Sequence, residues 1–83
     1  MDGPDWWSWD LEPKPHLFQK MLDRRFNEVD LRLMLEAAVG LRDGREGGRF
    51  VIKTTHDGRP WEVVVEPSSA EQVLIVVTTD PAG

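Results

Sequence analysis

The spacing of apolar residues changes twice along the chain, and each change predicts a different element. Residues 7–12 alternate apolar with polar side chains, which is the period of a half-buried strand. Within residues 16–40 the apolar side chains recur every three or four positions, as on one stripe of a helix. The apolar positions expected for the first helix are Phe18, Met21, Leu22 and Phe26. Residues 49–79 return to alternation in runs rich in strand-forming residues, which predicts a sheet.

The middle segment predicts two helices separated by a tight joint. Asn27 is a residue type that caps helices, and Asp30 stands three positions later, where the two residues can cap each other. Phe26 and Leu31 occupy the flanking positions at which a hydrophobic contact fixes the start of a helix. Gly40 is a natural place for the second helix to end. We therefore expect a helical hairpin.

The last third of the chain predicts an antiparallel meander of three strands. Asp57 and Gly58 separate the first two runs, and glycine accepts the positive φ that hairpin turns require. Pro67 is expected to end the second run, because proline cannot donate a backbone hydrogen bond. The aliphatic run 73–77 is typical of a strand covered on both faces. The hairpin can cover one face, and the other face or an exposed edge then needs the N-terminal strand or a partner molecule.

These elements predict a single α+β domain with the order β-α-α-β-β-β. Eighty-three residues can form only one core, since a second would leave neither half enough buried area. An N-terminal strand comes first, the helical hairpin follows, and the antiparallel meander closes the chain. Three segments are expected to lie outside regular structure: residues 1–5, 42–48 and 79–83.

Composition excludes several classes of protein. The longest aliphatic run has five residues, far short of the roughly 20 that a membrane helix needs. The chain also lacks the basic start and apolar stretch of a secretory signal. Without cysteine it has no disulfide, thiolate metal site or thiol catalysis, and two histidines 40 positions apart make a poor zinc site. We expect a cytoplasmic protein with no metal, no cofactor and no membrane association.

The charge is acidic in total but unevenly distributed. The formal net charge of −5 argues against a dedicated binder of duplex nucleic acid. All ten Lys and Arg lie within residues 14–59, whereas residues 1–13 and 60–83 carry acidic charges without basic ones. This distribution is compatible with a local anion site and equally with ordinary charge scatter.

Five short blocks of the chain are similar to a known family. The blocks are His16-(x3)-Lys20-(x3)-Arg24 and residues 26–31, 48–52, 57–65 and 76–78. Across roughly residues 9–81 they resemble a family of small bacterial and phage-borne domains related to the RelE/ParE- and BrnT-type toxins. The resemblance implies a helical hairpin packed on an antiparallel sheet (RelE-like). It also implies a role in a toxin–antitoxin or mobile-element system, with an antitoxin as partner and RNA as target.

The sequence departs from the family pattern in two places. Lys20 stands where the family usually has arginine, and residues 78–81 lack the aromatic residue that often precedes the closing proline. The chain also contains no tyrosine, whereas an aromatic residue or histidine near the C-terminus is a frequent catalytic element of RelE-type ribonucleases. Both departures weigh against nuclease activity.

The candidate catalytic residues are His16, Lys20, Arg24 and Arg49. The first three repeat every four positions, so they would share one face of the first helix. Metal-independent RNA cleavage needs groups that exchange protons and cations around the phosphate. Histidine titrates near neutrality and suits the proton role, and lysine and arginine can hold phosphate oxygens. A solvated helix face with acidic neighbours would show the same pattern.

Trp6, Trp7 and Trp9 form the second unusual cluster. Tryptophan is enriched at binding hot spots, so these three side chains are candidates for anchoring a protein partner. In the structural alternative, Trp7 and Trp9 cover the sheet while Trp6 points to solvent. Stacked single-stranded bases would meet repulsion between their phosphates and the acids of residues 1–13.

Two functional hypotheses stay open from the sequence. In the first, the chain is a toxin-like domain that cuts RNA, with His16 as acid or base and Lys20, Arg24 and Arg49 holding phosphate. In the second, it is a non-catalytic interaction module of the same fold. That module would bind another protein, or a second copy of itself, through the tryptophan segment or a free sheet edge.

Overall fold

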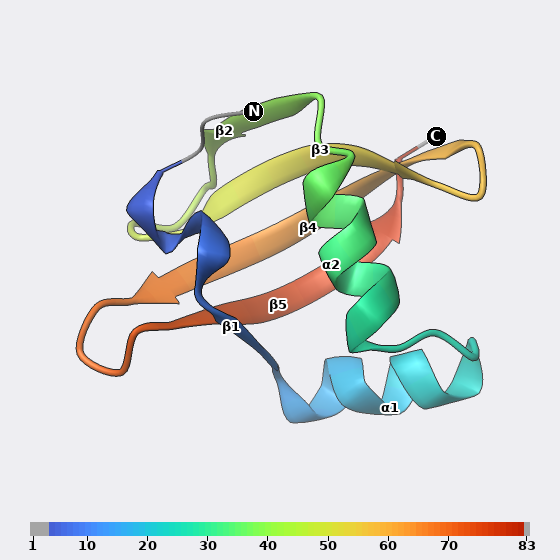
Figure 1. Cartoon of the computed structure of the whole chain (residues 1–83), viewed down its shortest axis with the longest axis horizontal. Helices are drawn as coiled ribbons and strands as arrows, with labels where there is room; N and C mark the ends of the chain where they lie inside the picture. The colour runs from blue at the N-terminus through green and yellow to red at the C-terminus, as the bar shows by residue number, and fades with distance from the viewer. Residues whose placement is uncertain (1–3, 83) are drawn as a thin grey trace.

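The computed structural model describes residues 4–82, in which two short α-helices pack on a sheet of five strands (Figure 1). The elements, in chain order, are a 3-10 helix η1 (Asp5–Ser8), β1 (Asp10–Pro13), α1 (Pro15–Asp23), α2 (Glu28–Glu36), β2 (Gly40–Asp43), β3 (Phe50–His56), β4 (Arg59–Ser68) and β5 (Val73–Pro81). A strand, then helices, then further strands is the expected order. The predicted α+β class is therefore confirmed.

The five strands form one mixed sheet in the order β1-β5-β4-β3-β2. Strands β2 to β5 pair antiparallel with their neighbours. Strand β1 instead runs parallel to β5, with Asp10 opposite Val73 and Pro13 opposite Val76. The first strand therefore adds to the last one, as the neighbouring blue and red ribbons of Figure 1 show.

Both helices lie on the same side of the sheet (Figure 1). Helix α2 contacts β3, whereas α1 contacts β5. The core between these layers consists of Leu17, Met21, Phe26, Leu31, Met34, Leu35, Ile52, Val63, Val65, Leu74 and Val76. Neither helix has the length and apolar character needed to cross a membrane.

The joint between the helices forms as the sequence predicts. Asn27 Oδ1 accepts hydrogen bonds from the backbone N–H groups of Val29 and Asp30, at 2.9 and 3.2 Å. In return, Asp30 Oδ2 accepts one from the Asn27 N–H at 2.9 Å. This reciprocal cap satisfies backbone donors that the first turn of a helix leaves unpaired. The prediction that the second helix ends at Gly40 is wrong, because α2 ends at Glu36 and Gly40 begins β2.

The hairpin between β3 and β4 also forms as predicted. His56 pairs with Arg59, so the loop contains only Asp57 and Gly58. Their φ values are +52° and +74°, the left-handed conformation that both residues of a tight hairpin turn adopt. The sequence Asp-Gly supplies the two residue types that tolerate it.

Four predicted boundaries are wrong. The strand expected over residues 7–12 begins only at Asp10, because residues 7 and 8 belong to η1. Residues 42 and 43, expected in a loop, pair with β3 and complete β2. Residues 79–81 continue β5 instead of fraying, because they pair with residues 61–63 of β4. Strand β4 does not end at Pro67 but continues to Ser68. Of the expected N-terminal tail, residues 1–3 lie outside the described part of the chain, as does Gly83.

The expectation that β5 is covered on both faces is also wrong. Leu74 and Val76 are buried beneath the helices, but Ile75 and Val77 are only half-buried. Successive side chains of a strand point to opposite faces. Both α-helices cover the same face, so within residues 4–82 the other face carries no helix.

Candidate functional site

The predicted catalytic stripe lies on the outer side of α1. His16 and Arg24 are exposed, and Arg24 is the residue that caps the end of the helix. Lys20 Nζ lies 3.8 Å from Asp80 Oδ1 on β5, in an ion pair that is open to solvent. His16 and Lys20 therefore lie on α1 and Arg24 lies at its end. The carboxylate of Asp80 lies beside Lys20.

Arg49 lies away from this stripe. Phe50 and Ile52 pack into the core, so Arg49, which alternates with them, points to the face of the sheet that carries no helix. Its Nε lies 3.2 Å from Glu66 Oε1, and its Nη1 lies 3.1 Å from Glu46 Oε2. The sheet thus separates Arg49 from the other three candidate catalytic residues.

The tryptophan segment packs against the core. Trp6, Trp7 and Trp9 are all half-buried and contact the core cluster. The ring of Trp6 lies 5.2 Å from the ring of Phe50 and 5.7 Å from that of Trp7, measured between centroids. The expectation that Trp6 points to solvent is wrong, because η1 folds the segment back over the start of β3.

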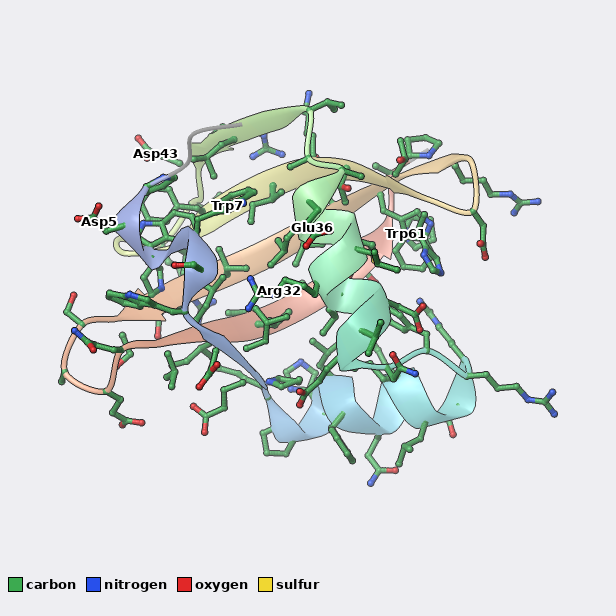
Figure 2. All side chains as sticks on the ribbon, viewed as in Figure 1. Asp5, Trp7, Arg32, Glu36, Asp43 and Trp61 are labelled. Atoms are coloured by element: carbon green, nitrogen blue, oxygen red, sulfur yellow. The ribbon has the colours of Figure 1, made fainter. Side chains whose placement is uncertain are left out.

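Arg32 on α2 anchors this segment. Its Nη1 donates to the carbonyl oxygen of Trp7 at 3.0 Å, and its Nη2 donates to that of Trp9 at 2.7 Å. Figure 2 shows the Arg32 side chain reaching from α2 toward η1. Nothing in the sequence pattern distinguishes Arg32 from the other arginines, because its partners are backbone atoms more than 20 residues away.

An open groove of about 670 Å³ lies between β1 and α2. Its apolar lining consists of Leu11, Val29 and Leu33, and its charged lining of Asp10, Glu28, Glu36 and Arg32. Figure 2 labels Arg32 and Glu36, one turn apart on α2. The groove therefore has an apolar floor and a mostly acidic rim.

A second groove, of about 310 Å³, lies between α1 and the start of α2. Its lining is mainly apolar and consists of Phe18, Met21, Leu22, Phe26, Asn27, Glu28 and Val29. Glu28 and Val29 line both grooves, so the two grooves adjoin at the start of α2. We call the two adjoining grooves together the helix-face groove.

The helix-face groove includes apolar positions that the core does not use. Leu17 and Met21 form the buried stripe of α1, so the expectation that Phe18 and Leu22 belong to it is wrong. Phe18 and Leu22 are spaced four residues apart, and Val29 and Leu33 repeat that spacing on α2. Side chains at this spacing lie on one helix face. A second apolar stripe on each helix is the sequence signal for this groove.

Comparison of the chain with protein-family models, with curated proteins and with solved structures finds no match. The resemblance to RelE- and BrnT-type toxins therefore stays a prediction. The geometry and chemistry of the chain itself define the candidate site.

Proposed function

We propose that the protein is a non-catalytic interaction module that binds another protein along the helix-face groove. The observation that carries this proposal is the exposure of four large apolar side chains along the two adjoining grooves. The exposed fractions are 47% for Phe18, 60% for Leu22, 67% for Val29 and 56% for Leu33. Large apolar side chains that gather at the surface of a small protein are typical of interaction sites.

These side chains offer apolar area that a partner can bury. Full burial of one large aliphatic or aromatic side chain contributes about 1.5–3 kcal/mol. These side chains stand on two helices whose other faces are packed into the core, and the start of α2 is capped by Asn27. A rigid surface loses little conformational entropy on binding, so more of this energy appears as affinity.

The other interaction surfaces offer less to a partner. The three tryptophans already pack against the core, which leaves only part of each ring exposed. The edge strands β1 and β2 contain four residues each, too few for an extended ladder with another chain. Both observations favour the helix-face groove.

The ribonuclease hypothesis has weaker support. Catalysis on a phosphate requires the proton-transfer group and the cations to converge on one position. His16 is exposed, Lys20 lies beside Asp80, and Arg49 points to the opposite face of the sheet with two carboxylates around it. The helix-face groove is lined by other residues.

A display library of random peptides, selected for binding to the full chain, tests the proposal. Binders should lose about tenfold or more in affinity toward the Leu33→Asp variant, because a buried charge replaces an apolar contact. Leu33 is exposed, so thermal unfolding should show that this variant stays folded. The matched control is Val39→Asp, since Val39 is 77% exposed and lies outside the groove. A selection that returns no binder, or binders indifferent to Leu33→Asp, would overturn the proposal.

A further inference from the structure

The rim of the helix-face groove carries unpaired negative charge. Asp10 on β1 and Glu28 and Glu36 on α2 are all exposed. None of the three forms an ion pair with another residue in 4–82. Glu28 also stands in the first turn of α2, where the helix dipole stabilises a carboxylate.

The one basic residue in this lining is already engaged. Arg32 directs Nη1 and Nη2 at the carbonyl oxygens of Trp7 and Trp9, so these donors are not free for a ligand. The three carboxylates outnumber this single guanidinium, and the chain as a whole carries a net charge of −5. The carboxylates of the lining and the net charge of the chain therefore favour a cationic ligand over a polyanion such as nucleic acid.

The walls of the groove favour a helix as the bound segment. Its apolar floor is formed mainly by two helices. The backbone N–H and C=O groups of a helix are hydrogen-bonded to each other, so they cannot pair with an added strand. β1 is the one strand that lines the groove, and it contains four residues. Amphipathic helices dock into such grooves with apolar residues at positions i, i+3 or i+4, and i+7.

We infer that the occupant is a cationic amphipathic helix of a partner protein. Its apolar side would contact Leu33, Val29 and Leu22, and its Lys or Arg residues would face the carboxylates of the rim. This inference rests on the proposed function, because it names the partner chemistry for the same groove.

Three synthetic peptides with one set of apolar residues test the inference by titration into the full chain. The first carries lysine and arginine at its polar positions, the second carries glutamate there, and the third is the first with a central proline. The cationic peptide should bind at least about tenfold more tightly than either of the others. Its affinity should fall as salt is raised, because screening weakens contacts between exposed charges.

Charge variants of the protein provide the matched controls. Glu36→Lys should lower the affinity for the cationic peptide by about fivefold or more, and Glu28→Gln by about threefold, in line with direct charge contacts. A lysine in the last turn of α2 is compatible with the helix dipole, so Glu36→Lys should remain folded. Glu71→Lys changes the net charge equally at an exposed turn outside the groove and should have little effect.

The two proposals fail in different ways. Library binders that depend on Leu33 but are neutral or acidic would overturn the inference and leave the proposed function standing. Equal binding of the cationic peptide and its proline variant would overturn the helical part of the inference. The absence of any groove-dependent binder, from the library or among the three peptides, would overturn both.

Discussion

The guanidinium of Arg32 holds the backbone of Trp9, with Nη2 2.7 Å from the carbonyl oxygen. The same guanidinium binds the carbonyl oxygen of Trp7 through Nη1. Both carbonyls stand at the end of η1, where a helix leaves its acceptors without internal partners. Arg32 therefore satisfies these acceptors and joins α2 to the segment that leads into β1. Strand β1 and helix α2 line the larger part of the helix-face groove.

Replacing Arg32 by methionine should destabilise the protein. The substitution removes two charge-assisted hydrogen bonds and leaves partly buried carbonyls unpaired, so the free energy of unfolding should fall by about 1–3 kcal/mol. Urea unfolding followed by tryptophan fluorescence measures the change. The control is Arg42→Met, which breaks an exposed ion pair with Glu62 and should cost less than about 1 kcal/mol. Equal losses in the two variants would contradict a structural role for Arg32.

Two buried threonines should respond in opposite ways to replacement by valine. Thr54 Oγ1 donates to the carbonyl oxygen of Met34, so Thr54→Val should lower the free energy of unfolding by about 1–2 kcal/mol. The buried hydroxyl of Thr79 has no hydrogen-bond partner within residues 4–82. Thr79→Val keeps the shape and removes this cost, so stability should stay equal or rise by up to about 1 kcal/mol. Thermal unfolding of both variants measures these changes. A comparable loss of stability in Thr79→Val would show that the Thr79 hydroxyl has a hydrogen-bond partner.

Features determined by neighbouring residues could be predicted from the sequence. The Asn27–Asp30 cap and the Asp57–Gly58 turn each depend on residues a few positions apart, and both form. The alternation of residues 49–79 likewise predicts strands because one face of each is buried. Local chemistry was sufficient for the α+β class.

Features determined by distant contacts could not be predicted in this way. β2 contains Gly40 and Asp43, which are poor strand formers, and it exists because it pairs with β3. The parallel pairing of β1 with β5 joins the two ends of the described chain. The candidate site depends on such contacts as well, because periodicity marks Leu22 and Val29 as apolar but not as exposed neighbours.

Removal of the cap at the start of α2 should weaken the hairpin that carries the groove. Asn27→Ala eliminates the acceptor of two backbone N–H groups, so the free energy of unfolding should fall by about 1 kcal/mol. Asn27→Ser retains a capping oxygen and should lose only a small part of that stability. Urea unfolding of both variants provides the comparison. An alanine variant as stable as the wild type would show that packing alone fixes the start of α2.

The proposed interaction module predicts no hydrolysis of RNA. The purified chain, incubated with single-stranded RNA in the presence of EDTA, should leave it intact, and its expression in bacteria should not arrest growth. His16→Ala and Arg24→Ala should behave as the wild type in both assays, because these exposed side chains do not converge on a common position with Arg49. RNA cleavage that the His16→Ala variant loses would identify a catalytic histidine. That result would replace the proposed function with the toxin-like ribonuclease, since general acid–base catalysis requires such a group.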